Sequence, residues 1–268
     1  MPLLLLGARV ELTSRRWQPP ARHWPDSPLV GGRDEEAGGT WLAVHPGVPR
    51  VSCLLNARGQ QAPPGNRRSR GELPLRAAAD GQEALKQLYE DTGALARYDP
   101  FLLICADLSS ALMLSWDGTR AALENLGPAT HLITNAGHAY PPPSAGSASA
   151  GSASAGSASA APEAADDPKA LHFGPKFAAY RPAADPAASI QDAWGDWLTL
   201  ADGDGLPLAD PAAIIVRRDL PDGRVWGTTS VTLVALGPEG LRYDFQPVPG
   251  QATWAGQATW YPVDLDAR

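Results

Sequence analysis

Cysteine is scarce in this chain, and the patterns that usually carry metal or nucleophile chemistry are missing. The 268 residues contain only Cys53 and Cys105, each within an apolar run. A thiol in such a run usually behaves as a small buried hydrophobic group, so we predict that neither cysteine is a nucleophile or a metal ligand. The five histidines form no HExxH motif and no cluster with cysteine, which predicts no structural or catalytic metal.

Long apolar stretches are absent as well. No run approaches the roughly 20 residues that cross a bilayer. The apolar start from Met1 to Gly7 is too short for a signal peptide and lacks its cationic flank. We therefore expect a cytoplasmic protein without a membrane partner.

Basic residues are outnumbered, with 22 Lys and Arg against 29 Asp and Glu, for a net charge of −7. Phosphate binding needs a dense cationic face, so this balance predicts no nucleic-acid partner. The segment Asn66–Arg70 (NRRSR) is a local exception. Two interpretations stay open for it: a solvated loop or an anion-binding loop.

Apolar residues are plentiful at 44% of the chain, enough for a sizeable core in one domain spanning residues 1–268. Within it, residues 141–165 have low complexity: three prolines lead into a repeated GSASA unit and then into acidic residues. This composition predicts a flexible loop insertion in the domain.

Apolar runs with β-branched or aromatic residues, bounded by turn residues, predict strands. These runs lie at 3–8, 41–45, 50–56, 101–106, 111–116 and 131–135. The stretches 225–237 and 240–246 predict a closing hairpin around a Gly-Pro-Glu-Gly turn.

Helical periodicity appears twice. Residues 71–91 place Ala84, Leu85 and Leu88 on one face, and residues 190–200 predict one amphipathic helix in which Trp194 and Trp197 are core residues. Strands that follow strands without intervening helices predict an α+β fold and not a parallel βαβ fold.

Several strings in a fixed order carry a family resemblance. They are Arg9, Arg15 and Trp17 followed by PPARHWPD at 19–26, GGRDEEAGGTWLAV at 31–44, LLNARG at 54–59 and SRGELPL at 69–75, with WGTTSVTLVAL late in the chain. With these strings, the chain resembles the NRDE family, also called the transport and Golgi organisation protein 2 family, over nearly its whole length outside 141–165.

The resemblance implies a four-layer αββα fold like that of the N-terminal nucleophile hydrolases. In those enzymes a cysteine at position two attacks a carbonyl beside the free terminal amine. This sequence has Pro2 there, so it has no catalytic nucleophile as numbered, and the strand that bears the family's cysteine is expected to be missing. The name-giving motif has also changed, because Ala8 and Val10 stand where the family has Asn and Asp, while Arg9 and Glu11 match.

Seven residues are the candidate binding groups: Arg9, Glu11, Arg33, Asp34, Asn56, Arg58 and Asn135. Arg9 and Glu11 are two apart on a predicted strand and so share a face. The resemblance makes Arg9 a clamp for an anion, and the alternative is an ordinary Arg–Glu pair.

The other candidates have structural alternatives too. Arg33 and Asp34 follow two glycines that we interpret as architectural turns, with the two side chains forming a loop ion pair or else bordering a pocket. Asn56 with Arg58, and separately Asn135, end strands, where an amide can hold a carbonyl oxygen or simply form a turn.

Three hypotheses about function follow. The first is a non-catalytic protein that binds or handles a small molecule, and the resemblance implies haem or acyl-CoA as its cargo. The second is an amide or acyl hydrolase whose true start lies upstream. The third is a degenerate remnant, since loss of a central strand would leave a sheet edge unpaired.

Overall fold

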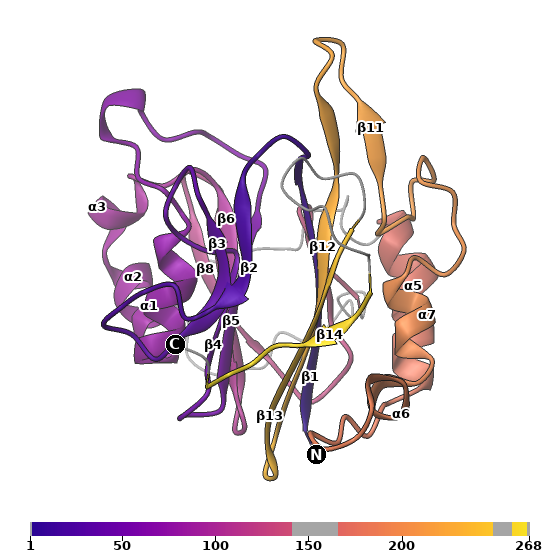
Figure 1. The fold of residues 1–268 in the computed structure, drawn as a ribbon. Coiled ribbons are helices and arrows are strands. Elements are labelled where there is room, and N and C mark those ends of the chain that lie inside the picture. Colours follow the sequence, from indigo (N-terminus) through magenta and orange to yellow (C-terminus); the bar gives the residue numbers. More distant parts are fainter. Residues whose placement is uncertain (1, 141–165, 249–258, 267–268) are drawn as a thin grey trace, which may run out of the picture.

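The computed structural model describes residues 2–140, 166–248 and 259–266, and the predicted insertion at 141–165 lies outside them. The described elements stack as helices, sheet, sheet and helices, so that the two sheets face each other in the middle (Figure 1). This arrangement confirms the predicted α+β fold class.

The larger sheet has seven antiparallel strands in the described residues, in the order β2-β3-β4-β5-β6-β7-β8. Their bounds are β2 (Trp17–Ala21), β3 (Val30–Asp34), β4 (Leu42–His45), β5 (Arg50–Asn56), β6 (Phe101–Asp107), β7 (Ala111–Trp116) and β8 (Ala121–Leu126). The strands β4 to β7 were predicted from their apolar runs and are confirmed. Sequence analysis did not predict β2, β3 and β8.

The second sheet follows the order β1-β12-β13-β14, with β11 paired beside the start of β12. Its bounds are β1 (Leu3–Leu12), β11 (Arg217–Asp219), β12 (Val225–Gly237), β13 (Gly240–Pro247) and β14 (Tyr261–Pro262). The hairpin of β12 and β13 is confirmed, but it does not end the chain, because β14 adds to β13. A separate two-stranded hairpin consists of β9 (Leu132–Thr134) and β10 (Gly137–Tyr140).

A bulge interrupts the pairing of β1 with β12 near the middle of the molecule. Arg9 lies opposite Ser230 while Val10 lies opposite Thr228, so Thr229 is the extra residue of β12. Bulges redirect side chains and are frequent beside functional sites. Here the bulge brings the Thr229 hydroxyl to the Arg9 guanidinium.

Helices cover the outer face of each sheet. The seven-stranded sheet carries α1 (Glu72–Asp80), α2 (Gln82–Glu90) and α3 (Thr92–Leu95), preceded by a short 3-10 helix at Pro64–Asn66. The second sheet carries α5 (Pro168–Ala179), α6 (Ile190–Trp194) and α7 (Trp197–Ala201). No helix of the described residues is long and apolar enough to cross a membrane.

The prediction of one helix at 190–200 is wrong. Gly195 breaks it with φ +50° and separates α6 from α7. A Cβ atom at this position would lie 2.6 Å from the Tyr180 hydroxyl, so the tyrosine ring occupies the space where a helix side chain would be. Trp194 and Trp197 nevertheless lie in the core, as predicted.

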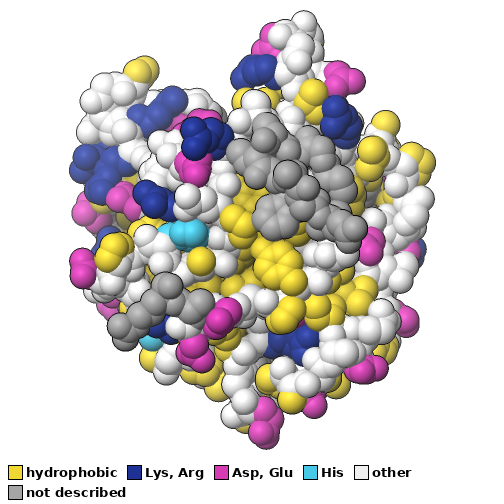
Figure 2. All heavy atoms as spheres, viewed as in Figure 1, with side chains coloured by type: hydrophobic (Ala, Val, Ile, Leu, Met, Phe, Trp, Pro, Cys, Tyr) yellow, Lys and Arg dark blue, Asp and Glu magenta, His cyan; other side chains and the backbone are white. Residues whose placement is uncertain are grey.

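Three apolar clusters hold the four layers together. Leu85, Leu88 and Leu95 pack on the outer face of the seven-stranded sheet. Between the sheets, Trp17, Val44 and Val51 meet Val234 and Phe245. Hydrophobic side chains gather along the seam between the two sheets on the face drawn in Figure 2. A third cluster packs Phe173, Trp194 and Trp197 against Leu233 and Ala235 of β12.

Candidate functional site

A cavity of about 1850 Å³ lies between the sheets, alongside β1. Its walls are the whole of residues 2–11, the end of β5, the loop at 67–71, the segment 125–136 and one side of α5. In the described residues β1 ends the strand order of the second sheet, and the cavity lies along this end. Its volume exceeds the roughly 300–1,000 Å³ that is usual for a small-molecule site.

Basic residues dominate the polar lining, in contrast to the acidic chain as a whole. Among the described residues, nine basic and five acidic side chains line the cavity. The basic ones are Arg9, Arg15, Arg58, Arg67, Arg68, Arg70, Lys169, Arg181 and Arg218, and the acidic ones are Glu11, Asp34, Asp99, Asp107 and Asp167. The rest of the wall is largely apolar and includes Leu4, Leu6, Phe173 and Phe177.

The structure brings six of the seven candidate residues to this one cavity: Arg9, Glu11, Asp34, Asn56, Arg58 and Asn135. Arg33 is the exception. It alternates with Asp34 along β3 and borders a separate shallow hollow with Arg16, Gln18 and Glu35.

Arg9 is held on three sides. Its guanidinium donates to the Thr229 hydroxyl at 2.9 Å and to the Asp34 carboxylate at 3.4 Å, and it lies 4.5 Å from the centre of the Trp41 ring. Burial lowers the pKa of Arg9, although the neighbouring Glu11 and Asp34 charges oppose the shift. Its main carboxylate partner is therefore Asp34 and not Glu11, and its side chain is a fixed part of the cavity wall.

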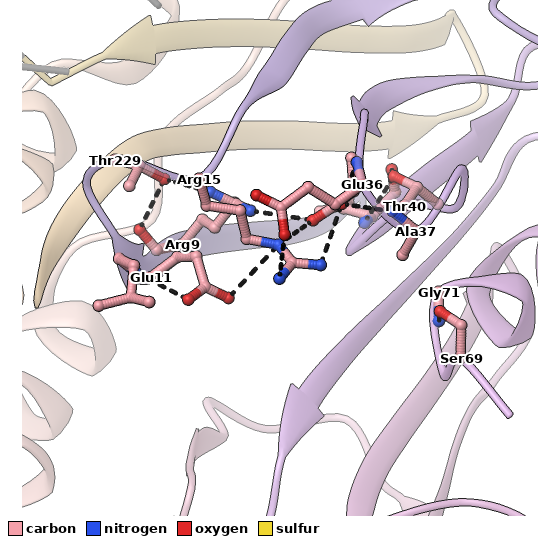
Figure 3. A network of polar contacts seen from close by, with 12 residues as sticks. Arg9, Glu11, Arg15, Glu36, Ala37, Thr40, Ser69, Gly71 and Thr229 are labelled. Carbon is pink, nitrogen blue, oxygen red and sulfur yellow. Dashed lines mark hydrogen bonds and ion pairs between the residues drawn. The ribbon is translucent and has the colours of Figure 1, made fainter. Parts of the chain in front are cut away.

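Asp34 is the centre of a polar network, of which Figure 3 shows Arg9, Arg15 and Glu36. The Arg15 guanidinium donates to its two oxygens at 2.6 and 3.1 Å, and the amides of Glu36 and Ala37 also donate to it. Burial alone would raise the pKa of Asp34, but these hydrogen bonds and the charges of Arg15 and Arg9 outweigh it and lower the pKa. Its hydrogen bond to Asp34 in turn raises the pKa of Arg15.

This network corrects the interpretation of Arg33 and Asp34 as a loop ion pair. In the described part of the chain, Asp34 pairs with Arg9 and Arg15, and Arg33 forms no ion pair with it. The glycines before them are not turn residues either, since both lie in β3. A Cβ atom at Gly31 would lie 2.4 Å from the Leu42 carbonyl oxygen, and one at Gly32 would lie 2.2 Å from the Trp41 ring. Close packing, and not a positive φ, requires glycine here.

Glu11 and Arg15 complete the network on the cavity side. Glu11 lies 3.9 Å from Arg15, and its carboxylate accepts the amide of Leu12 at 2.7 Å. Arg15 was recognised in the sequence only as an alignment landmark, although it forms the shortest ion pair to Asp34. No local pattern indicates this contact, because it joins the β1–β2 turn to the end of β3.

Residues 67–70 of the basic segment also line the cavity, and the carbonyl of the adjoining Gly71 accepts the Thr40 amide at 2.9 Å, so that Figure 3 shows Ser69 and Gly71 near Thr40. Arg67 pairs with Asp99 at 3.1 Å, and Arg68 pairs with Glu72 at 2.6 Å. Arg70 differs from both, because within the described residues it forms no ion pair and donates to the Pro100 carbonyl at 2.6 Å. Burial lowers the pKa of Arg70. Its charge is thus the one in this segment that no carboxylate neutralises directly.

The asparagines and cysteines lie as their local patterns predict. Asn56 ends β5, and Asn135 lies in the turn between β9 and β10; both are exposed. Cys105 is fully buried, while Cys53 is half-buried and borders the cavity. Burial raises the pKa of each thiol to about 12, so both stay protonated at neutral pH.

The comparisons with known proteins agree with the family that the motifs suggested. A model of the family described as Transport and Golgi organisation 2 matches residues 1–148, which is more than half of the chain. No curated protein matches the chain. The matched region includes the Arg9–Asp34–Arg15 network, the basic segment 66–70 and all seven strands of the larger sheet from β2 to β8. By this match the chain belongs to the Transport and Golgi organisation 2 family.

Proposed function

We propose that this protein binds a small amphipathic anion in the cavity between its sheets and handles it without turning it over. The observation that carries the proposal is the composition of the wall, which joins an excess of basic side chains to an apolar surface. An anionic group would lie near Arg70, and an apolar body would extend along Leu55, Leu126 and Ile133 on the larger-sheet side of the cavity. Haem, with its propionates, and a long-chain acyl-CoA both have this chemistry.

Arg70 is the residue that best suits the anion. Its guanidinium is half-buried and lacks a carboxylate partner among the described residues, so an anion there would gain a charge-assisted hydrogen bond with little competition. Arg9 is less suited, because each of its two terminal nitrogens already donates to Thr229 or Asp34 and the Asp34 carboxylate would repel an anion. The role of Arg9 in this proposal is to fix the wall beside the ligand.

Titration of the purified protein with haem, followed by absorbance, and with palmitoyl-CoA, followed by thermal shift, tests the proposal. At least one of them should bind. Arg70→Gln should weaken that binding by about tenfold or more, since a hydrogen bond to a charged group contributes roughly 1.5–3 kcal/mol. Arg33→Gln is the matched control, because Arg33 lies outside the cavity. Absence of binding by both ligands, or equal effects of the two substitutions, would reject the proposal.

Acyl transfer through a thiol is the alternative, since Cys53 borders the cavity. It is less favoured, because a thiol with a pKa of about 12 supplies almost no thiolate at neutral pH. Incubation with palmitoyl-CoA and assay of released coenzyme A separate the two functions. If the unmodified protein releases coenzyme A and Cys53→Ala does not, hydrolysis and not binding is the main activity.

A further inference from the structure

The strand β1 has a free edge in the described residues. It pairs along its length with β12 and ends the strand order of its sheet. No backbone hydrogen bond from another described segment reaches the opposite edge between Leu3 and Ala8. Every second residue of this stretch therefore presents an amide and a carbonyl that have no backbone partner in the described part of the chain.

This edge lies within the cavity and not on an open surface. Every residue from Pro2 to Glu11 borders the cavity. On one side, Cys53 and Ile104 of the larger sheet line it, and on the other side Phe173 and Phe177 of α5 do. The sheet of a second folded copy is too thick to enter between these layers, whereas a single extended chain fits, since stacked sheets lie about 10 Å apart.

The free amides and carbonyls of β1, together with the apolar walls, favour a peptide over an acyl chain at this edge. An acyl chain would bury the free amides and carbonyls without hydrogen bonds, which costs free energy for each group. A peptide strand supplies both donors and acceptors. Its side chains would alternate between Ile104 on one face and Phe173 on the other, and both surroundings are apolar. At the Pro2 end, Arg181 donates to the Pro2 carbonyl and places a positive charge there.

We propose that the Leu3–Ala8 edge of β1 binds an extended apolar peptide segment with an acidic end, as an added strand inside the cavity. Six residues of strand span about 20 Å. The added strand would leave the end of the cavity near Glu11 and Arg70 for the small ligand. The inference goes beyond the proposed function and does not depend on it.

The probe is a fluorescein-labelled peptide of eight alternating valines and alanines with an aspartate at each end. Its control carries N-methyl groups on two consecutive central residues, so that each edge of the peptide loses one donor while the side chains stay the same. Anisotropy measures binding to the full-length protein, and residue-resolved hydrogen exchange follows the amides of residues 3–8. In the free protein we expect about half of these amides to exchange fast, because alternate amides point away from β12.

The parent peptide should bind and slow the exchange of those amides. The N-methylated peptide should bind at least about tenfold more weakly, because a lost hydrogen bond and a methyl group in the ladder together cost about 1.4 kcal/mol or more. Equal binding of the two peptides would mean that the cavity takes apolar groups without strand pairing, and absence of binding would exclude this occupant. Uniformly slow exchange in the free protein would show that another segment already covers the edge. Each of these three results overturns the proposal, while haem or acyl-CoA binding can persist in all of them.

Discussion

At the scale of single residues, Asp34 has the largest predicted effect on stability. Its side chain is 13% exposed and that of Arg9 is 7% exposed, so their charges interact with little screening by water. Asp34→Asn keeps the shape but removes the carboxylate that the Arg9 guanidinium contacts and the one nearest to Arg15. We expect the free energy of unfolding to fall by about 3 kcal/mol, as is typical when one partner of a buried pair is removed.

Urea unfolding measures this loss, and Glu36→Gln is its control. Glu36 also pairs with Arg15, at 3.1 Å, but its side chain is 54% exposed. Exposed pairs contribute at most about 1 kcal/mol, so this control should stay close to the unmodified protein. Similar losses in the two variants would show that Asp34 is not the centre of the network.

The lowered pKa of Asp34 gives a prediction about pH. A carboxylate with a lower pKa in the folded than in the unfolded state contributes stability that is complete above the unfolded pKa of about 3.9. That contribution is lost as the pH falls through the folded pKa. The unfolding free energy of the unmodified protein should therefore exceed that of Asp34→Asn by a constant amount of about 3 kcal/mol between pH 5 and 7. Below about pH 4 this difference should become smaller. A difference independent of pH down to about 2.5 would contradict the pKa shift.

At the scale of elements, Gly195 decides where α6 ends and α7 begins. Each helix has five residues, which is too short to be stable without packing. Gly195→Ala would meet both a backbone at φ +50° and ψ −126°, which L-residues avoid, and the Tyr180 hydroxyl at 2.6 Å. Gly205→Ala would introduce only the free-energy cost of a positive φ, which is +72° here. No other atom lies within 4 Å of the added carbon.

Thermal and urea unfolding of the two variants separate these effects. We expect Gly205→Ala to cost about 1 kcal/mol, the usual penalty of the left-handed conformation for an L-residue. Gly195→Ala should cost at least about 1 kcal/mol more, because the tyrosine must leave its place. Equal costs would mean that the Tyr180 side chain moves freely and does not define the break.

Elements that are apolar along their whole length were the ones that could be predicted from sequence. The strand β6 is buried from Phe101 to Ala106, so its composition alone identifies it. In contrast, β2 contains two prolines and β3 two glycines, residues that disfavour strands. Long-range packing against Trp41 and Leu42 holds β3 in place, and no local pattern encodes that packing.

At the scale of the whole molecule, the fold class and six polar residues of the cavity wall could be inferred, whereas the partners of those residues could not. Arg9 and Asp34 were both candidates, but their pairing joins positions 25 residues apart through β1 and β3. Arg70 was one of several arginines in a basic segment until its contact with Pro100 distinguished it. A sequence gives the residue types at a site, while their free or paired state depends on the tertiary contacts.

The two cysteines can report separately on the inner and outer layers of the molecule. Cys53 and Cys105 lie on the adjacent strands β5 and β6 but on opposite faces of the larger sheet, since Cys53 borders the cavity and Cys105 packs under α1, 3.3 Å from the Ala77 carbonyl oxygen. With each pKa raised to about 12, both thiols of the native protein should react slowly with a disulfide reagent at pH 8.

The Cys105→Ala variant leaves Cys53 alone, and Cys53→Ala leaves Cys105 alone, so each rate can be measured by itself. Cys53 should react faster, because the cavity gives solvent access without unfolding, while Cys105 should react only as fast as the protein opens globally. A ligand that fills the cavity should then slow Cys53 by direct protection. It should slow Cys105 only by the factor that it adds to overall stability. Equal rates for both thiols in the absence of ligand would mean that the cavity opens no more readily than the outer core, and small molecules would then have no direct route between the sheets.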